Sequence, residues 1–353
     1  MEIRFDKIDT DKDYITVFNG EKDVVIKKEE FLTYIQKKQG IPISKWVKDL
    51  NTLKVIGLKE HNVAFSPSSQ DIVVNSKYET VKNIPWENLS SLNFDSTKEY
   101  KLHLNKSCES HINDYAMGSD MAFFLKSNPS ITEIVVDDDI TTIGYKGFIG
   151  APVRNIIIGK GITSIESHAF ASTQIEEMII PDNVISLGQS LFYDTEKLYK
   201  VVLNDSLESV EPNVFEGARG LKTVIFGKNI KTLCNRSFSR TGLESIILPS
   251  TIETIEESAF QESSFMKKIV ISEGTKVIKS YAFNCMSKLE TVDFPSSLTS
   301  IGESLFWGCS TTLQINYKGT KENFLKISNN KHISDGCTIH CTDGDIIEKA
   351  PVV

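Results

Sequence analysis

The chain has 353 residues, of which 40% are hydrophobic and 24% charged, an ordinary mix for a folded protein that excludes disorder as its main state. Its formal net charge is −8, and most of the excess acid lies after residue 120. Binding to nucleic acid or to an anionic membrane surface needs clustered Lys and Arg, so the composition argues against both.

The N-terminal residues carry charges where a signal peptide needs an apolar stretch, and no later run approaches the roughly 18 apolar residues of a membrane-spanning helix. The six cysteines are scattered and do not form a disulfide framework: Cys108, Cys234, Cys285, Cys309, Cys337 and Cys341. We therefore expect a cytoplasmic protein. A cell-surface or secreted location is the alternative if a leader has been removed.

Residues 1–110 show no internal repeat and predict a small α+β domain. The expected elements are a hairpin of strands at 14–18 and 24–26 around Asn19-Gly20, helical stretches at 28–39 and 46–50, a loop at 66–70, and a strand at 72–74. Residues 111–130 are expected to form an N-terminal cap that contains a degenerate first repeat, with an apolar helical pattern near 117–127.

From residue 131 the sequence repeats every 22 or 23 residues. The repeat is anchored by one phenylalanine in each copy: Phe148, Phe170, Phe192, Phe215, Phe238, Phe260, Phe283 and Phe306. Columns 5, 12, 14 and 17 residues before each anchor are apolar in all eight copies, and the column 8 before breaks once, at Thr275. Such agreement indicates one structural unit that is repeated along residues 131–318.

The offsets predict the shape of that unit. Positions 14 and 12 before the anchor alternate with period two, which is typical of a short strand with one buried face. Turn formers such as Pro181-Asp182-Asn183 follow, and each anchor closes a short helical or irregular segment such as 257–260. So small a unit cannot bury its apolar face alone, so the units must stack as a solenoid with a parallel sheet on one face.

The pattern stops after a ninth strand that fits Thr312, Ile315 and Tyr317. A short helix is expected near Glu322–Ser328, followed by the Thr338–Ile346 segment. Because a solenoid must cover its last apolar layer, residues 319–353 are interpreted as a C-terminal cap and tail.

The repeats Ile252–Phe260 and Leu298–Cys309 resemble those of the BspA-like leucine-rich repeat family, and Thr338–Ile346 resembles the endings of such arrays. The resemblance covers roughly residues 120–347. It implies an α/β fold, a leucine-rich-repeat solenoid preceded here by the small α+β domain, and a binding role, often at cell surfaces.

No set of residues points to catalysis. There is no Walker-type glycine loop, dinucleotide fingerprint or His-Glu-x-x-His helix, and His168 is interpreted as a solvent-facing spacer. Cys337-x-x-His340-Cys341 resembles a metal cluster but lacks a clear fourth ligand, although His332 is nearby; Cys108-x-x-His111 is weaker. We expect no catalytic residue, no metal and no cofactor.

The position 13 before each anchor should point outward from the sheet. It is apolar in seven consecutive copies: Val135, Ile157, Ile179, Val202, Ile225, Ile247 and Val270, followed by Asp293. The column 15 before the anchor forms a mixed polar rim that includes Glu177 and Lys200. An apolar centre with a polar edge suits a protein interface, although strand propensity or internal cover explains the same residues.

The first hypothesis is a non-catalytic protein-interaction module that uses this face, in a narrower form a stoichiometric inhibitor or effector of a basic partner. A cell-surface adhesin is one alternative. The other is an enzyme with its activity in residues 1–110 and substrate selection by the repeats. The sequence does not decide the partner or the oligomeric state.

Overall fold

The computed structural model describes residues 92, 94–106, 112, 120–329, 333 and 337–347, and the backbone of six short strands within residues 1–81. The chain divides into two compact units, Met1–Glu79 and Thr80–Val353. The helical stretches expected at 28–39 and 46–50, the loop at 66–70, the pair Cys108 and His111, and His332 lie outside the described residues.

The first unit contains a five-stranded antiparallel sheet in the order β3-β2-β1-β4-β5. Its strands are β1 (Glu2–Ile3), β2 (Tyr14–Phe18), β3 (Asp23–Lys27), β4 (Val63–Phe65) and β5 (Ile72–Val74). Strands β2 and β3 pair antiparallel over their full length, which confirms the predicted hairpin.

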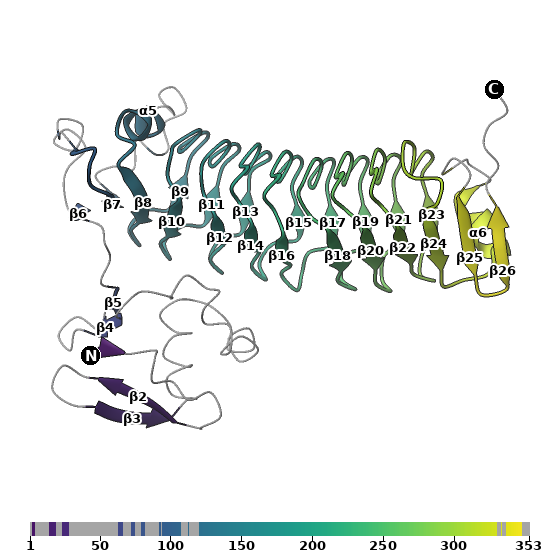
Figure 1. The fold of residues 1–353 in the computed structure, drawn as a ribbon, viewed down its shortest axis with the longest axis horizontal. Coiled ribbons are helices and arrows are strands. Elements are labelled where there is room, and N and C mark those ends of the chain that lie inside the picture. Colours follow the sequence, from purple (N-terminus) through teal and green to yellow (C-terminus); the bar gives the residue numbers. More distant parts are fainter. Residues whose placement is uncertain are drawn as a thin grey trace. The chain divides into compact units, whose positions relative to one another are not determined.

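The second unit is a solenoid in which each coil contributes two strands (Figure 1). The longer strands stack in a first column: β8 (Ile131–Val136), β10 (Asn155–Ile158), β12 (Glu177–Ile179), β14 (Lys200–Val202), β16 (Thr223–Ile225), β18 (Ser245–Leu248), β20 (Lys268–Ile271), β22 (Thr291–Phe294) and β24 (Gln314–Tyr317). All ladders within this column are parallel, which confirms the predicted sheet.

A second column of two-residue strands was not predicted. It consists of β9 (Thr142–Ile143), β11 (Ser164–Ile165), β13 (Ser186–Leu187), β15 (Ser209–Val210), β17 (Thr232–Leu233), β19 (Thr254–Ile255), β21 (Val277–Ile278) and β23 (Ser300–Ile301). Each of these strands buries its second residue, which belongs to the apolar column 5 before the anchor. The anchor segments themselves are turns, so the irregular alternative of the prediction is the correct one.

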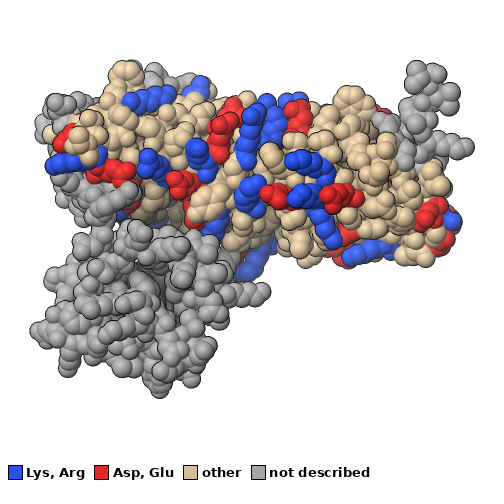
Figure 2. All heavy atoms as spheres, viewed as in Figure 1, with Lys and Arg blue, Asp and Glu red and all other residues tan. Residues whose placement is uncertain are grey.

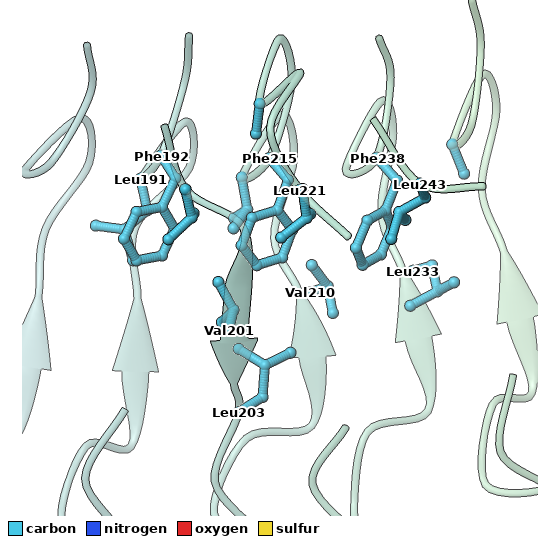
Figure 3. Close-up of a cluster of buried hydrophobic side chains, with 14 of the residues drawn as sticks. Leu191, Phe192, Val201, Leu203, Val210, Phe215, Leu221, Leu233, Phe238 and Leu243 are labelled. Carbon is cyan, nitrogen blue, oxygen red and sulfur yellow. The ribbon is translucent and has the colours of Figure 1, made fainter. Parts of the chain in front are cut away.

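The eight anchor phenylalanines form a continuous stack inside the solenoid. Each is at most 1% exposed, and neighbouring rings stack with centroids 5.1–5.8 Å apart. Figure 3 shows Phe192, Phe215 and Phe238 in this stack, with Val201 and Leu203 of the first column below them. Burial of each ring is worth about 1.5–3 kcal/mol, so the stack is a major source of stability.

Thr275, the one polar break in the apolar columns, is fully buried. Its hydroxyl donates a 2.7 Å hydrogen bond to the carbonyl oxygen of Ile252 in the preceding coil. A buried hydroxyl without a partner would cost about 1–3 kcal/mol, so this bond makes the substitution tolerable.

The turn around each anchor has an unusual backbone. The residues two before and two after the phenylalanine have positive φ in all eight coils, whether or not they are glycine. This conformation costs a non-glycine residue roughly 1–2 kcal/mol. It also aligns the backbone N–H groups for coil-to-coil bonds: Asn213, Phe215 and Gly217 donate to the carbonyls of Asn235, Ser237 and Ser239 at 2.9–3.0 Å.

Both ends of the first column are covered by additional elements. At the N-terminal end, β7 (Tyr100–Leu104) pairs in parallel with β8, β6 (Glu79–Val81) is the outermost strand, and α5 (Asp120–Ser127) buries Met121 and Leu125. At the C-terminal end, β25 (Thr338–Cys341) and β26 (Gly344–Ile347) extend the sheet as a hairpin.

The predicted C-terminal helix is α6 (Lys321–Ser328), whose N-terminus is capped by the Thr320 hydroxyl. Its Phe324 packs edge-on against Tyr317 at 5.3 Å and is buried, so α6 helps to cover the last coil. In the described part of the chain, no helix has the length and apolar character to span a membrane. The predicted domain boundaries at residues 110, 130 and 318 stay predictions.

We expect Phe215→Ala to lower the free energy of unfolding by about 3–5 kcal/mol, because it leaves a cavity between two stacked neighbours. Phe215→Leu keeps most of the apolar volume and should cost clearly less. Urea unfolding followed by circular dichroism measures both variants. A cost below about 1 kcal/mol for the alanine variant would contradict the role of the stack.

Candidate partner-binding surface

The outward row of the first strand column is accessible. We name it the apolar stripe: Val135, Ile157, Ile179, Val202, Ile225, Ile247 and Val270. The exposed fractions of Ile157, Ile179 and Ile247 are 45%, 38% and 70%, and the four other members are half-buried. In β10 and β18 the burial alternates strictly, so period two places the stripe outside, as predicted.

The strand register brings stripe residues side by side. Val135 is opposite Ile157, Ile247 is opposite Val270, and Val202 lies between Ile179 and Ile225. Neighbouring parallel strands lie about 4.8 Å apart, so these apolar side chains contact one another across the coils. The stripe is therefore a continuous surface within each run of paired strands.

The first column is interrupted between β16 and β18, which belong to different sheets. Val224 and Phe226 of this coil are only half-buried, although their equivalents in the other coils are buried. The phenylalanine stack stays closed at the same level, with Phe215 and Phe238 5.1 Å apart. Additional apolar surface is consequently exposed beside Ile225 and Ile247, at the middle of the stripe.

Charges along the polar rim are largely paired with one another. Lys200 lies 3.3 Å from Glu177, and Lys268 lies 3.6 Å from Asp293. Glu133, expected as an exposed rim residue, is instead buried beside Lys101. On the described part of the face drawn in Figure 2, acidic and basic side chains interleave.

Tyr199 lies next to this rim and donates its hydroxyl to the Glu177 carboxylate. Partial burial, and then this bond and the nearby negative charge, raise the pKa of Tyr199 well above its usual value. The phenol therefore stays protonated and holds the Glu177 carboxylate in place, so this part of the rim is preorganised.

Polar residues close both ends of the row. His103 stands opposite Val135 and bonds through Nδ1 to Asp137 at 2.9 Å. At the other end, Asp293 is opposite Val270 and accepts a 2.7 Å bond from Asn316. Sequence reasoning did not assign the two ends beyond Asp293, although counting outward positions into the flanking strands finds them.

The cluster Cys337, His340 and Cys341 does not converge. On β25, His340 lies in register with Asn316 of the outward row, whereas Ile339, on the other face, is buried. Cys341 is an odd number of residues from His340, so it points to the face opposite His340. His340 bonds instead to Gln314 at 2.7 Å and to Asp345 at 2.9 Å, and Cys337 is buried.

His168 is half-buried and does not face solvent as expected. Its ring packs edge-on against Tyr145 at 5.8 Å, and Nδ1 is shielded without a hydrogen-bond partner. Burial, and to a lesser extent Lys146, lower the pKa of His168, so its imidazole is neutral near pH 7. A shallow depression nearby is lined by Tyr145, Glu166, Gln189 and serine hydroxyls, without a cysteine or a histidine.

The cysteine thiols in the described coils are held in their protonated form. Burial raises the pKa of Cys234 to about 11 and that of Cys309 to about 12. The Cys309 thiol donates to the carbonyl oxygen of Phe283 at 3.1 Å, a coil-to-coil contact. Since the thiolate is the nucleophilic form, these two groups suit packing rather than nucleophilic catalysis.

The model of the BspA type leucine rich repeat region matches the chain in six copies, over residues 120–242, 186–313 and 231–334. These ranges together span more than half of the chain. Among curated proteins, no significant match to the sequence was found.

Several solved structures are similar to the chain. A leucine rich cell surface protein from Faecalibacterium prausnitzii is 18% identical, with a TM-score of 0.40, over 72% of this chain and 74% of that one. A leucine-rich repeat protein from Eubacterium ventriosum is 21% identical, with a TM-score of 0.38, over 58% and 64%. The pneumococcal vaccine antigen PcpA is 18% identical, with a TM-score of 0.32, over 60% and 68%.

We expect Cys309 in the folded protein to react with iodoacetamide at pH 8 at least about tenfold more slowly than in urea, because its raised pKa leaves little thiolate. Mass spectrometry of quenched time points measures the rate for this cysteine. The urea-unfolded chain is the control for intrinsic reactivity. Equal rates in the two states would show that the thiol is neither buried nor protonated as described.

Proposed function

Because the chain belongs to the BspA type leucine rich repeat family, we propose that it is a non-catalytic interaction module that binds a protein partner through the apolar stripe. The observation that carries the proposal is the row of seven outward apolar residues, three of them more than a third exposed. Folded proteins seldom leave a long contiguous apolar surface uncovered unless it serves an interface.

The surroundings of the stripe support this role. A polar rim with Glu177 and Lys200 runs beside the apolar centre, which is the usual anatomy of a protein interface. The surface lies on paired strands backed by the phenylalanine stack, so few backbone groups need to become ordered when a partner binds. Such preorganisation favours recognition because binding then costs less conformational entropy.

A narrower form of the proposal is a stoichiometric inhibitor or effector of a basic partner. The chain carries a net charge of −8, and an acidic protein accelerates encounters with a cationic one. The apolar stripe would supply the contact and the overall charge would supply the steering.

We expect the triple variant Ile179→Lys, Val202→Lys and Ile225→Lys to lose at least about tenfold in capture of its partner from native lysate. Three lysines would have to be desolvated against an apolar partner surface. The matched control is Ser186→Lys, Ser209→Lys and Thr232→Lys, which places the same charges outward on the second strand column. Unchanged capture by a stripe variant with wild-type thermal stability would rule out the stripe as the binding site.

For a basic partner, raising the salt concentration from about 50 to about 500 mM should slow association several-fold and change dissociation little, because screening acts on long-range steering. Surface plasmon resonance on the captured protein separates the two rates. Association that does not depend on salt would remove the basic partner but leave the stripe proposal intact.

A further inference from the structure

The stripe offers a partner side chains but no backbone groups. The backbone N–H and C=O groups of its strands point along the sheet and pair with neighbouring coils, as in the ladders of β14 with β12 and β16. A segment that lies on the stripe must therefore satisfy its own backbone. An extended peptide cannot do so alone, and each unpaired buried group would cost about 1–3 kcal/mol. An α-helix satisfies these groups internally.

The dimensions of the stripe also suit a helix. Six steps of about 4.8 Å separate Val135 from Val270, which gives a row approximately 29 Å long. A helix of roughly 19 residues has that length. One face of a helix presents a side chain about every 5.4 Å, close to the strand spacing, whereas one face of an extended chain presents a side chain about every 6.8 Å.

The stripe is a single residue wide. On one side lie rim residues that are uncharged or paired with one another, such as Thr223 and the pair of Glu177 and Lys200. On the other side the coils turn at small or rigid residues: Gly159, Pro181, Gly227 and Pro249. A narrow apolar ridge between uncharged borders fits this surface better than a broad apolar face does.

From these features we propose that the partner's recognition element is an amphipathic α-helix that lies along the apolar stripe, perpendicular to the strands. This inference rests on the proposed function and specifies its occupant. The apolar residues of the helix recur at i, i+3, i+4 and i+7 and are flanked by uncharged polar residues. Its largest apolar side chain packs at Ile225 and Ile247, where the half-buried Phe226 adds surface.

The probe for the test is a pair of displayed libraries of 20-residue peptides. One library is built on a stabilised helical scaffold, and the other carries the same residues with a proline at every fifth position, which prevents a helix. Both are selected against the full chain and counter-selected against the lysine variant of Ile179, Val202 and Ile225. We expect the helical library to yield at least about tenfold more stripe-dependent binders.

A second measurement gives the register of a selected helical binder. A photo-crosslinking residue replaces Ile157 in one variant and Ile247 in another, four coils away. The two crosslinked positions on a helix should be about 13 residues apart, whereas those on an extended chain should be about 6 apart. Mass spectrometry of the crosslinked peptides distinguishes these values.

The outcomes separate the two proposals. Stripe-dependent binders that come equally from the proline library, or crosslinks about 6 residues apart, overturn the helix and leave the stripe as the binding surface. A lack of stripe-dependent binders in either library overturns the helix as well, and unchanged lysate capture by the lysine variant would then remove the proposed function too. Helical binders with the longer crosslink spacing support the inference.

Discussion

The contact between phenylalanines of successive coils is the interaction on which the rest of this structure depends. A coil of 22 or 23 residues has one face of apolar side chains and cannot bury it alone, so its stability comes from the two coils that flank it. The stack from Phe148 to Phe306 provides that shared core, and it stays closed even where the first strand column is interrupted between β16 and β18. The outward surfaces of the strands therefore hold their positions without contributing to the core.

The solenoid, the first strand column and the outward position of the stripe could be predicted from the sequence, because each depends on the period of apolar residues. The second strand column could not, since each of its strands buries a single residue, as Ile165 does, and two residues are too few to show a period. The left-handed turn positions were also hidden. They hold Lys146, Arg236 and Tyr281 as well as glycine, so no residue type marks them.

The candidate surface was predictable in composition but not in detail. The interruption at β16 left no trace in the sequence, because Val224 and Phe226 fit their columns as well as any other residues. The burial of Glu133 depends on Lys101, a residue of a strand that was not predicted beside the first coil. The chemical nature of a position thus followed from the repeat, whereas its environment depended on neighbours outside the repeat.

The constant length of the coil has a consequence for how such a protein changes in evolution. Since every coil contacts its two neighbours through the same ladders, the duplication or loss of one 22- or 23-residue segment preserves both new junctions. Each event adds or removes one rung of the recognition face, a step of about 4.8 Å. The array is in this sense a ruler, and lineages could adjust its reach by counting whole units instead of by altering single side chains.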